Sequence, residues 1–393
     1  MPLDVTAIQN ALRAEGLDGW LLYDFQGVNP IARAVAGLGA TRKMTTRRWY
    51  YLIPAEGAPR KLVHRIEAGT LEAMPGTTSL YAGHASLDQA LASLLDGCRR
   101  VAMEYSPHCA IPYLSRVDAG TVEQVRACRV DVVSSGDLVQ QFMATWSPEA
   151  AASHRAAAAA LYRIKDRAFE ALRTVAGGAA LTEHALQQQM VGWFADEGLV
   201  SDAPPVVAAM ESAGDPHYQP SEAKSRAIGR NELVLLDLWG KRDTPGAVYA
   251  DISWVAFTGA DVPDEMTAAF AAIVAARDAA VALAASRLEA GGDVRGYEID
   301  RAARDVLREA GYEQAVFHRT GHSLGETVHG QGVHMDDYET HDTRRLLPGT
   351  GFTVEPGVYF EKFGMRTEIN VLVGNRTVEV TGPRQMEIIR LSA

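Results

Sequence analysis

Residues 318–329 read HRTGHSLGETVH and hold His318, His322 and His329. Five of the chain's 11 histidines fall between positions 318 and 341. Glycines at positions 321 and 325 lie on either side of His322, and a glycine lets the backbone approach a neighbouring group closely. Imidazoles gathered around permissive backbone indicate a functional site with His322 as a candidate ligand.

Four carboxylates flank this stretch, each in a segment that reads as a strand or a tight turn: Asp237, Asp251, Glu355 and Glu368. Four carboxylates and one imidazole carry too much negative charge to be buried together without cations. Mixed oxygen and nitrogen ligands suit Mn²⁺ or Co²⁺, with Zn²⁺ as a further option, better than copper or an iron–sulfur centre. The pattern predicts a hydrolytic site with two divalent metal ions.

Strand periodicity supports the pairing of these carboxylates. Asp237 and Asp251 sit on two apolar segments that a turn joins into a hairpin. Side chains alternate along a strand, so Asp251 and Ser253 share one face, as do Arg366 and Glu368. Taken singly, each pair also has a plainer interpretation: an aspartate that ends a strand, or an Arg–Glu ion pair on an open sheet face.

With His322, these carboxylates carry a family resemblance. The pita-bread metallopeptidases, which include Xaa-Pro dipeptidase (prolidase), aminopeptidase P and methionine aminopeptidase, have similar metal-binding motifs. The matching segments are Asp237, the Tyr-Ala-Asp run that ends at Asp251, residues 318–329, VEPGVY at 354–359 and RTE at 366–368. The resemblance implies an α+β fold with a catalytic pita-bread (creatinase/aminopeptidase-like) domain over residues 147–393.

Residues 1–145 resemble the smaller α/β accessory domain of the prolidase, aminopeptidase P and creatinase branch. The resemblance implies a role in dimerisation and at the mouth of the active site, so a homodimer is expected. Methionine aminopeptidases resemble only the C-terminal part. A basic cluster, Arg42, Lys43, Arg47 and Arg48, lies in this region. A solvated loop is the plainer interpretation, and capture of a substrate carboxylate by Arg47 is the functional alternative.

The same resemblance implies roles for the five candidate ligands. Asp237 would chelate one metal ion and His322 the other. Asp251 and Glu368 would bridge both ions. Glu355 would bind the ion on the His322 side and also move protons as the catalytic acid–base group.

Further residues match positions around the metal ions in the family. His217 and His329 match two histidines that flank the substrate, steadying the developing oxyanion and the proline side. Arg366 and Tyr359 match a pair that supports the ligands from outside the metal sphere.

The chain departs from the family pattern in three places. The loop between the two aspartates is longer than usual. The common Thr-Arg pair is replaced by Ser253 and Trp254, which keeps a hydroxyl near the metals but loses the arginine. Ser323 stands where many members have glycine. The longer loop and Trp254 are expected to alter the substrate pocket.

The expected reaction is hydrolysis of Xaa-Pro dipeptides. Two divalent ions about 3.5–4 Å apart share a water and lower its pKa to around 7, so a metal-bridging hydroxide attacks the scissile carbonyl. Glu355 passes the proton to the imino nitrogen of proline. The alternatives are an aminopeptidase P acting on longer peptides, a creatinase- or ectoine-hydrolase-like C–N hydrolase, and a non-enzymatic peptide-binding module.

The composition argues against a nucleic-acid-binding protein and against a membrane-spanning one. The 393 residues include 38 basic and 49 acidic side chains, a net charge of −11, and the absence of a basic stripe argues against nucleic acid as a partner. No apolar run reaches about 18 residues and the N-terminus lacks a signal pattern, so we expect a cytoplasmic protein without a membrane span. The cysteines Cys98, Cys109 and Cys128 fit no metal or redox spacing and are expected to be reduced.

Overall fold

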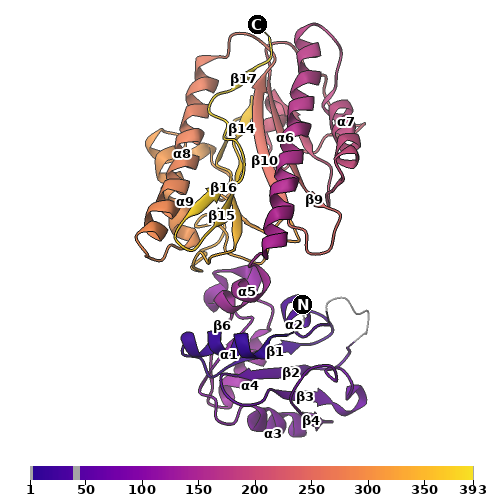
Figure 1. Ribbon diagram of the computed structural model, residues 1–393, viewed down its shortest axis with the longest axis vertical. Helices are drawn as coiled ribbons and strands as arrows, with labels where there is room; N and C mark the ends of the chain where they lie inside the picture. The colour runs from indigo at the N-terminus through magenta and orange to yellow at the C-terminus, as the bar shows by residue number, and fades with distance from the viewer. Residues whose placement is uncertain (1–2, 39–44, 393) are drawn as a thin grey trace. The chain divides into compact units, whose positions relative to one another are not determined.

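The computed structural model describes residues 3–38 and 45–392 and divides the chain into two compact units (Figure 1). Unit 1 is Met1–Val139 and unit 2 is Gln140–Ala393. The sequence-based boundary, between residues 145 and 147, follows helix α5 (Gly136–Met143), whereas the two units divide inside that helix. Gln140 accounts for the difference, because its side chain bonds the main chain of other residues of unit 2.

Unit 1 is built on one mixed six-stranded sheet of order β4-β3-β2-β1-β5-β6. Its central strand β1, GWLLYD, is buried along its whole length, as expected of a strand covered on both faces. The strands are β1 (Gly19–Asp24), β2 (Trp49–Pro54), β3 (Arg60–His64), β4 (Thr77–Tyr81), β5 (Arg100–Met103) and β6 (Asp131–Ser134). The α-helices before α5 are α1 (Val5–Ala14), α2 (Pro30–Val35), α3 (His84–Leu94) and α4 (Ala119–Ala127). Arg42 and Lys43 lie outside the described residues.

Unit 2 combines long helices with three antiparallel or mixed sheets, so the α+β class is confirmed. The helices are α6 (Pro148–Ala176), α7 (Glu183–Asp196), α8 (Asp264–Glu289) and α9 (Gly296–Glu309). One sheet joins β7 (Leu199–Val200), β8 (Val206–Ala209), β9 (Leu233–Arg242), β10 (Ala250–Phe257) and β17 (Ile389–Arg390). A second joins β11 (Ser323–Leu324), β12 (Gly351–Val354), β15 (Ile369–Val373) and β16 (Val378–Val380), and a third pairs β13 (Gly357–Tyr359) with β14 (Gly364–Arg366).

Helix α6 covers one face of the β9–β10 hairpin (Figure 1). The helix begins where Ser147 accepts a hydrogen bond from the Ala150 amide at 3.1 Å, with proline in the first helical position. Trp254 of β10 faces this helix: its ring meets Tyr162 edge-on at 6.0 Å, and the Lys165 ammonium lies 4.2 Å from its centre. The expectation that Trp254 shapes the substrate pocket is therefore wrong, because strand alternation points it away from Asp251.

Helix α8 packs against α9 and forms the other large core of unit 2. Among the described residues it is the one helix long and apolar enough, by length and composition, to cross a membrane. Over half of its apolar window, 56%, is buried inside the unit. Arg277, fully buried in its middle, donates to Thr367 Oγ1 at 3.1 Å and to the Gln385 carbonyl at 2.6 Å, which ties α8 to the segments that follow β14 and β16.

Candidate metal centre

The β9–β10 hairpin presents the two aspartates on its face away from α6. In the antiparallel register Ser253 lies directly opposite Asp237, and Asp251 lies two residues before Ser253 on the same face. The Ser253 hydroxyl lies 2.9 Å from Asp237 Oδ1 and 2.8 Å from Glu368 Oε2, and accepts from Arg366 Nε at 2.9 Å. Ser253 is thus the hydroxyl through which the hairpin contacts the C-terminal strands.

His322 and the two glutamates come from the second sheet and its edges. The His322 amide donates to Thr353 Oγ1 at 2.9 Å, and the Thr353 amide donates to the His322 carbonyl at 2.8 Å. Gly321 is required for this contact, since a Cβ there would lie 2.0 Å from the Thr353 carbonyl oxygen. Glu355 follows β12, and Glu368 precedes β15 with its amide bonded to the Ser253 carbonyl at 3.1 Å.

Asp251, His322 and Glu368 form the tightest group, with ligand atoms that all lie within 4.8 Å of one another. His322 Nδ1 donates to the Ser323 carbonyl at 3.1 Å, which leaves Nε2 with its lone pair towards the carboxylates. Nε2 lies 3.6 Å from Asp251 Oδ2 and 3.5 Å from Glu355 Oε1. All five predicted ligands are therefore joined, directly or through Ser253, into one buried cluster.

The electrostatics of this cluster favour a bound cation. Burial, followed by the charge of Asp237, raises the pKa of Asp251, and burial followed by the charge of Asp251 raises the pKa of Glu368. Within the described part of the chain, Asp251 Oδ1 and Glu368 Oε1 are buried without a hydrogen-bond partner. Burial lowers the pKa of His322, so its ring is neutral and able to bind a metal. The donor set therefore fits divalent metal ions.

Arg366 and Tyr359 support the cluster from its rim. Arg366 Nη2 lies 2.5 Å from Asp237 Oδ2, and its Nη1 donates to the Tyr359 hydroxyl at 3.1 Å. His318 accepts from that hydroxyl, with Nε2 at 2.7 Å, because its Nδ1 donates to the Arg319 carbonyl. Burial raises the pKa of Tyr359 to about 12, so the phenol keeps its proton.

The sequence analysis did not assign His318, Thr353 or Asn370 to the site. His318 extends the series of hydrogen bonds that runs from Arg366 through Tyr359. Asn370 Oδ1 accepts from the Asp251 amide at 2.9 Å. The strand alternation that pairs Arg366 with Glu368 also includes Asn370, so that signal was present. Nothing in the local pattern marks Thr353, whose role depends on pairing between distant segments.

The two candidate substrate histidines differ in position. The His329 ring meets the His322 ring edge-on at 4.5 Å, and burial lowers the pKa of His329 to about 4. His217 lies exposed on the loop after the 3₁₀ turn Met210–Gly214, where its amide donates to Asp215 Oδ1 at 3.0 Å. No described contact joins the His217 ring to the cluster. Arg47 lies exposed in unit 1 and donates to its neighbour Thr46.

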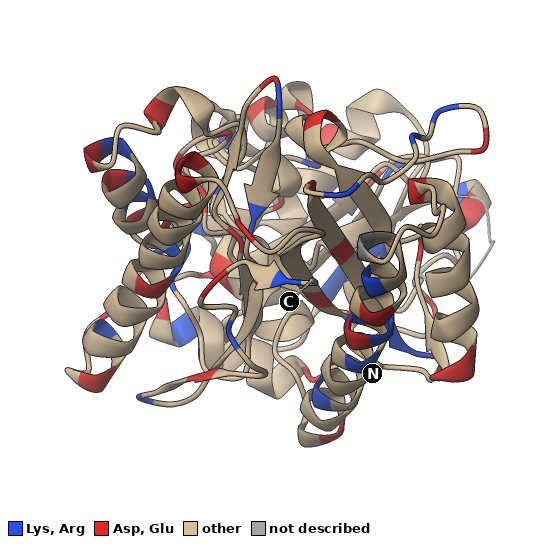
Figure 2. Cartoon of the chain, turned by 90° about the horizontal axis from the view of Figure 1, so that it is seen from above, with Lys and Arg blue, Asp and Glu red and all other residues tan. Residues whose placement is uncertain are grey.

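In the view of Figure 2, lysine and arginine positions are interspersed with acidic positions along the helices and loops.

Comparisons with known proteins agree with this geometry. The model of metallopeptidase family M24 matches residues 151–375. The probable dipeptidase PepE of Mycobacterium tuberculosis is 30% identical over 169 residues, which cover 43% of this chain and 41% of that protein. The Xaa-Pro dipeptidase of Lactobacillus delbrueckii subsp. lactis is 30% identical over 203 residues, which cover 51% of this chain and 49% of that protein. The chain thus spans less than half of the length of these curated relatives.

Among solved structures, the dipeptidase PepE of Mycobacterium ulcerans superposes with a TM-score of 0.68 at 22% identity, covering 99% of this chain and 97% of the other. At this identity the likeness concerns the fold. The predicted pita-bread fold with its preceding α/β domain is confirmed.

Proposed function

Because the chain belongs to metallopeptidase family M24, we propose that it hydrolyses Xaa-Pro dipeptides with two divalent metal ions, Mn²⁺ or Co²⁺ before Zn²⁺. The observation that carries the proposal is the buried group Asp251, His322 and Glu368, in which two carboxylate oxygens lack a partner among the described residues. Asp237 and Glu355 complete the proposed ligand set. The dipeptide substrate is suggested by the names of the relatives, PepE and Xaa-Pro dipeptidase.

Divalent ions at this cluster would activate a water molecule and polarise the scissile carbonyl. Glu355 is the proposed proton carrier: it accepts the proton of the water and delivers it to the imino nitrogen of proline. Thr353 Oγ1 holds Glu355 in place by donating to Oε1 at 3.2 Å. His329, neutral and beside His322, is the proposed donor to the carbonyl oxygen as negative charge develops there.

Arg366 and Tyr359 are proposed to hold Asp237 in its orientation. Removal of the guanidinium would leave a buried carboxylate unpaired, and groups outside the ligand sphere commonly affect metal affinity or activity by about 10–100-fold. His217 is proposed to contact the substrate. Its exposed loop is fixed at the next residue, because the Tyr218 hydroxyl donates to Glu183 Oε2 at 2.5 Å.

A substrate panel with metal dependence tests the activity. Purified protein, dialysed against EDTA and then given Mn²⁺, is offered Ala-Pro, Leu-Pro and the matching Xaa-Pro-Gly tripeptides, and released proline or free N-terminal residue is measured. Metal-dependent cleavage of the dipeptides is the expected result. Cleavage of the tripeptides alone would indicate aminopeptidase P, and activity that survives EDTA would indicate a metal-free, creatinase-like hydrolase. Cleavage of neither set would refute the peptidase.

Two matched variants test the ligands. Asp251→Asn removes a proposed bridging carboxylate, and activity should fall by more than about 100-fold, beyond the effect of outer partners. Asp243→Asn, exposed in the turn of the same hairpin, should retain full activity and metal content. Bound metal per chain is measured by plasma mass spectrometry. An Asp251→Asn protein that binds two metal ions and cleaves at the parent rate would rule out this ligand set.

Four expectations remain predictions: the homodimer, the role of residues 1–145 at the active-site mouth, the cytoplasmic location, and the binding of the substrate carboxylate by Arg47. Light scattering after gel filtration measures the oligomeric state. Arg47→Gln should raise KM for Xaa-Pro dipeptides with little change in kcat, because a carboxylate contact made equally in substrate and transition state affects binding. An unchanged KM would assign Arg47 no part in substrate capture.

A further inference from the structure

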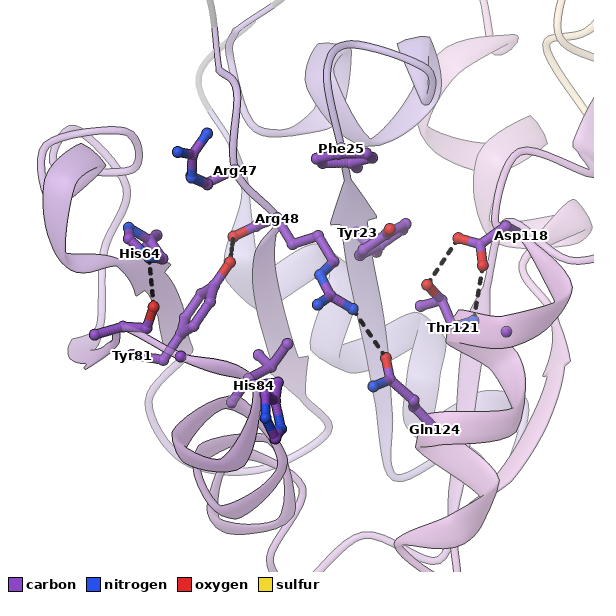
Figure 3. Close-up of a pocket in the computed structure, with 14 residues that line it drawn as sticks. Tyr23, Phe25, Arg47, Arg48, His64, Tyr81, His84, Asp118, Thr121 and Gln124 are labelled. Atoms are coloured by element: carbon purple, nitrogen blue, oxygen red, sulfur yellow. Dashed lines mark hydrogen bonds between the residues drawn. The ribbon is translucent and has the colours of Figure 1, made fainter.

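Unit 1 contains a cavity of about 820 Å³ whose lining residues all belong to that unit (Figure 3). Cavities of roughly 300–1,000 Å³ are typical of sites for small organic ligands. Its lining comes from the C-terminal ends of β1, β3 and β4, from the two residues before β2, and from the N-terminal parts of α3 and α4. Neither the proposed metal ligands nor the family motifs use it.

Two arginines, Arg47 and Arg48, face the cavity. The half-buried Arg48 reaches between Tyr23 and Tyr81 and donates to Gln124 Oε1 at 3.2 Å (Figure 3). Arg47, at the edge, donates to the main-chain and hydroxyl oxygens of Thr46. Within residues 3–38 and 45–392, neither guanidinium forms an ion pair. A guanidinium group favours carboxylate and phosphate anions, because these accept two parallel hydrogen bonds from its N–H groups.

The carboxylate of Asp118, also in the lining, is already engaged. Asp118 accepts from the amide and hydroxyl of Thr121 at 2.9 and 2.7 Å and caps helix α4 (Figure 3). Although burial raises it, these bonds from Thr121 hold the pKa of Asp118 below its ordinary value, so the group stays ionised. The lining thus holds two arginines and one carboxylate, in a chain whose net charge is −11. A second carboxylate, Glu67, lies outside the lining and accepts from the Arg47 amide at 3.1 Å.

The N-terminus of helix α3 faces the same space. Ala82, Gly83 and His84 line the cavity, and the first turn of the helix holds no acidic residue. The Ala82 and Gly83 amides donate to Ser86 Oγ at 3.1 and 3.0 Å, so the helix end contributes its partial positive charge, which attracts anions. His64 fixes this corner, because its Nδ1 accepts from Ile66 and its Nε2 donates to the Ala82 carbonyl at 2.9 Å. His84 is exposed and has no described hydrogen bond, so its imidazole is available.

Aromatic rings make up the remaining wall. Tyr23, Phe25 and Tyr81 line the cavity, and Phe25 is 38% exposed (Figure 3). Beneath them, the fully buried Tyr50 has a hydroxyl without a partner among the described residues, and its ring lies 5.1 Å from that of Tyr23. Buried polar groups without partners are rare and gather at functional sites. The lining thus combines a flat apolar surface with converging donors.

We propose that this cavity is a binding site for a small aromatic anion, a flat ring that carries a carboxylate or a phosphate. The anionic group would lie between the Arg48 guanidinium and the first turn of α3, and the ring would lie against Tyr23 and Phe25. This site is separate from the proposed metal cluster, since none of its residues is a proposed metal ligand; Arg47, at its edge, is the one lining residue that the proposed function also uses.

Calorimetric titration of the full-length, metal-loaded protein tests the proposal. The probes are phenyl phosphate and phenylacetate, with inorganic phosphate and benzyl alcohol as the anion-only and ring-only controls. One of the aromatic anions should bind with 1:1 stoichiometry and at least about tenfold more tightly than either control. The two probes distinguish a phosphate site from a carboxylate site.

Matched variants locate the binding. Arg48→Gln should weaken the preferred probe about tenfold or more, the usual effect of losing one charge-assisted hydrogen bond. Arg99→Gln removes an exposed arginine of unit 1 outside the lining and should leave the affinity unchanged. His84→Ala, at an exposed position, serves as a second variant if Arg48→Gln unfolds, and should weaken binding several-fold. Hydrolysis of Xaa-Pro dipeptides should be the same in all three variants.

Three outcomes would overturn the proposal: no probe binds, inorganic phosphate binds as tightly as the aromatic anions, or the Arg48 and His84 variants bind like the parent. The last result would also be obtained if the anion bound at the metal ions, because neither substitution touches them. Failure of dipeptide hydrolysis would refute the proposed peptidase activity but not the anion site, so the two proposals can be refuted separately.

Discussion

Protonation of one buried histidine is expected to destabilise unit 2 in mild acid. The fully buried His154 of α6 donates from Nδ1 to the Tyr249 carbonyl at 2.7 Å, and its Nε2 accepts from Thr381 Oγ1 at 2.8 Å. The first bond ties α6 to the residue before β10, the strand that carries Asp251, and the second ties it to the residue after β16. Burial lowers the pKa of His154 to about 4, because the charged ring is poorly solvated there.

The size of the effect follows from the two pKa values. An unfolded histidine titrates near pH 6.5, above the folded-state value of about 4. The neutral ring therefore contributes its full stabilisation above pH 6.5, and the contribution is lost as the pH falls towards 4. Between pH 7.5 and pH 5, proton linkage for this single group lowers the free energy of unfolding by about 2 kcal/mol.

His154→Asn isolates this contribution. Asparagine keeps an amide donor near the Tyr249 carbonyl but cannot be protonated. Urea unfolding at pH 7.5 and pH 5 gives the free energy of unfolding of both proteins. Wild type should lose about 2 kcal/mol more than the variant over this interval. His108→Asn, at an exposed left-handed position that asparagine tolerates, is the control and should behave as wild type. Equal pH dependence in the His154 variant and wild type would refute the reasoning.

Three further predictions concern the site and its surroundings. Tyr359→Phe removes the hydroxyl that accepts from Arg366 and should lower kcat about 10–100-fold; an unchanged kcat at full metal content would contradict this role. Trp254→Ala should lower the free energy of unfolding by about 3–5 kcal/mol without changing KM, since the ring packs on α6; a raised KM would place it at the substrate. EDTA should lower the Tm and Mn²⁺ restore it, because Asp251 and Glu368 repel each other; a Tm indifferent to Mn²⁺ would argue against a metal site.

The arrangement of the carboxylates along each strand was predictable from the sequence. Alternation placed Asp251 with Ser253, and in the structure Ser253 lies opposite Asp237 and accepts from Arg366. The strand expected to carry both Arg366 and Glu368 is interrupted, because Arg366 ends β14 and Glu368 precedes β15 of another sheet. The same rule already implied that Trp254 points to the other face. This part was predictable because the two-residue period of a strand is a property of its own backbone.

Contacts between distant segments were decided by the tertiary structure. His318 reaches the cluster through Tyr359, Thr353 holds His322, and the His217 ring makes no described contact with the metal ligands. The cavity of unit 1 likewise draws on separate strands, loops and helix starts between Tyr23 and Gln124.

The sequence alone thus determined the ligand types, their order and the faces they share. Which segments meet, which polar groups stay without partners and where a cavity opens depended on how sheets and helices pack. These features arise from burial and hydrogen bonding between residues far apart in the chain, and such pairings leave no periodic signal in the residues themselves.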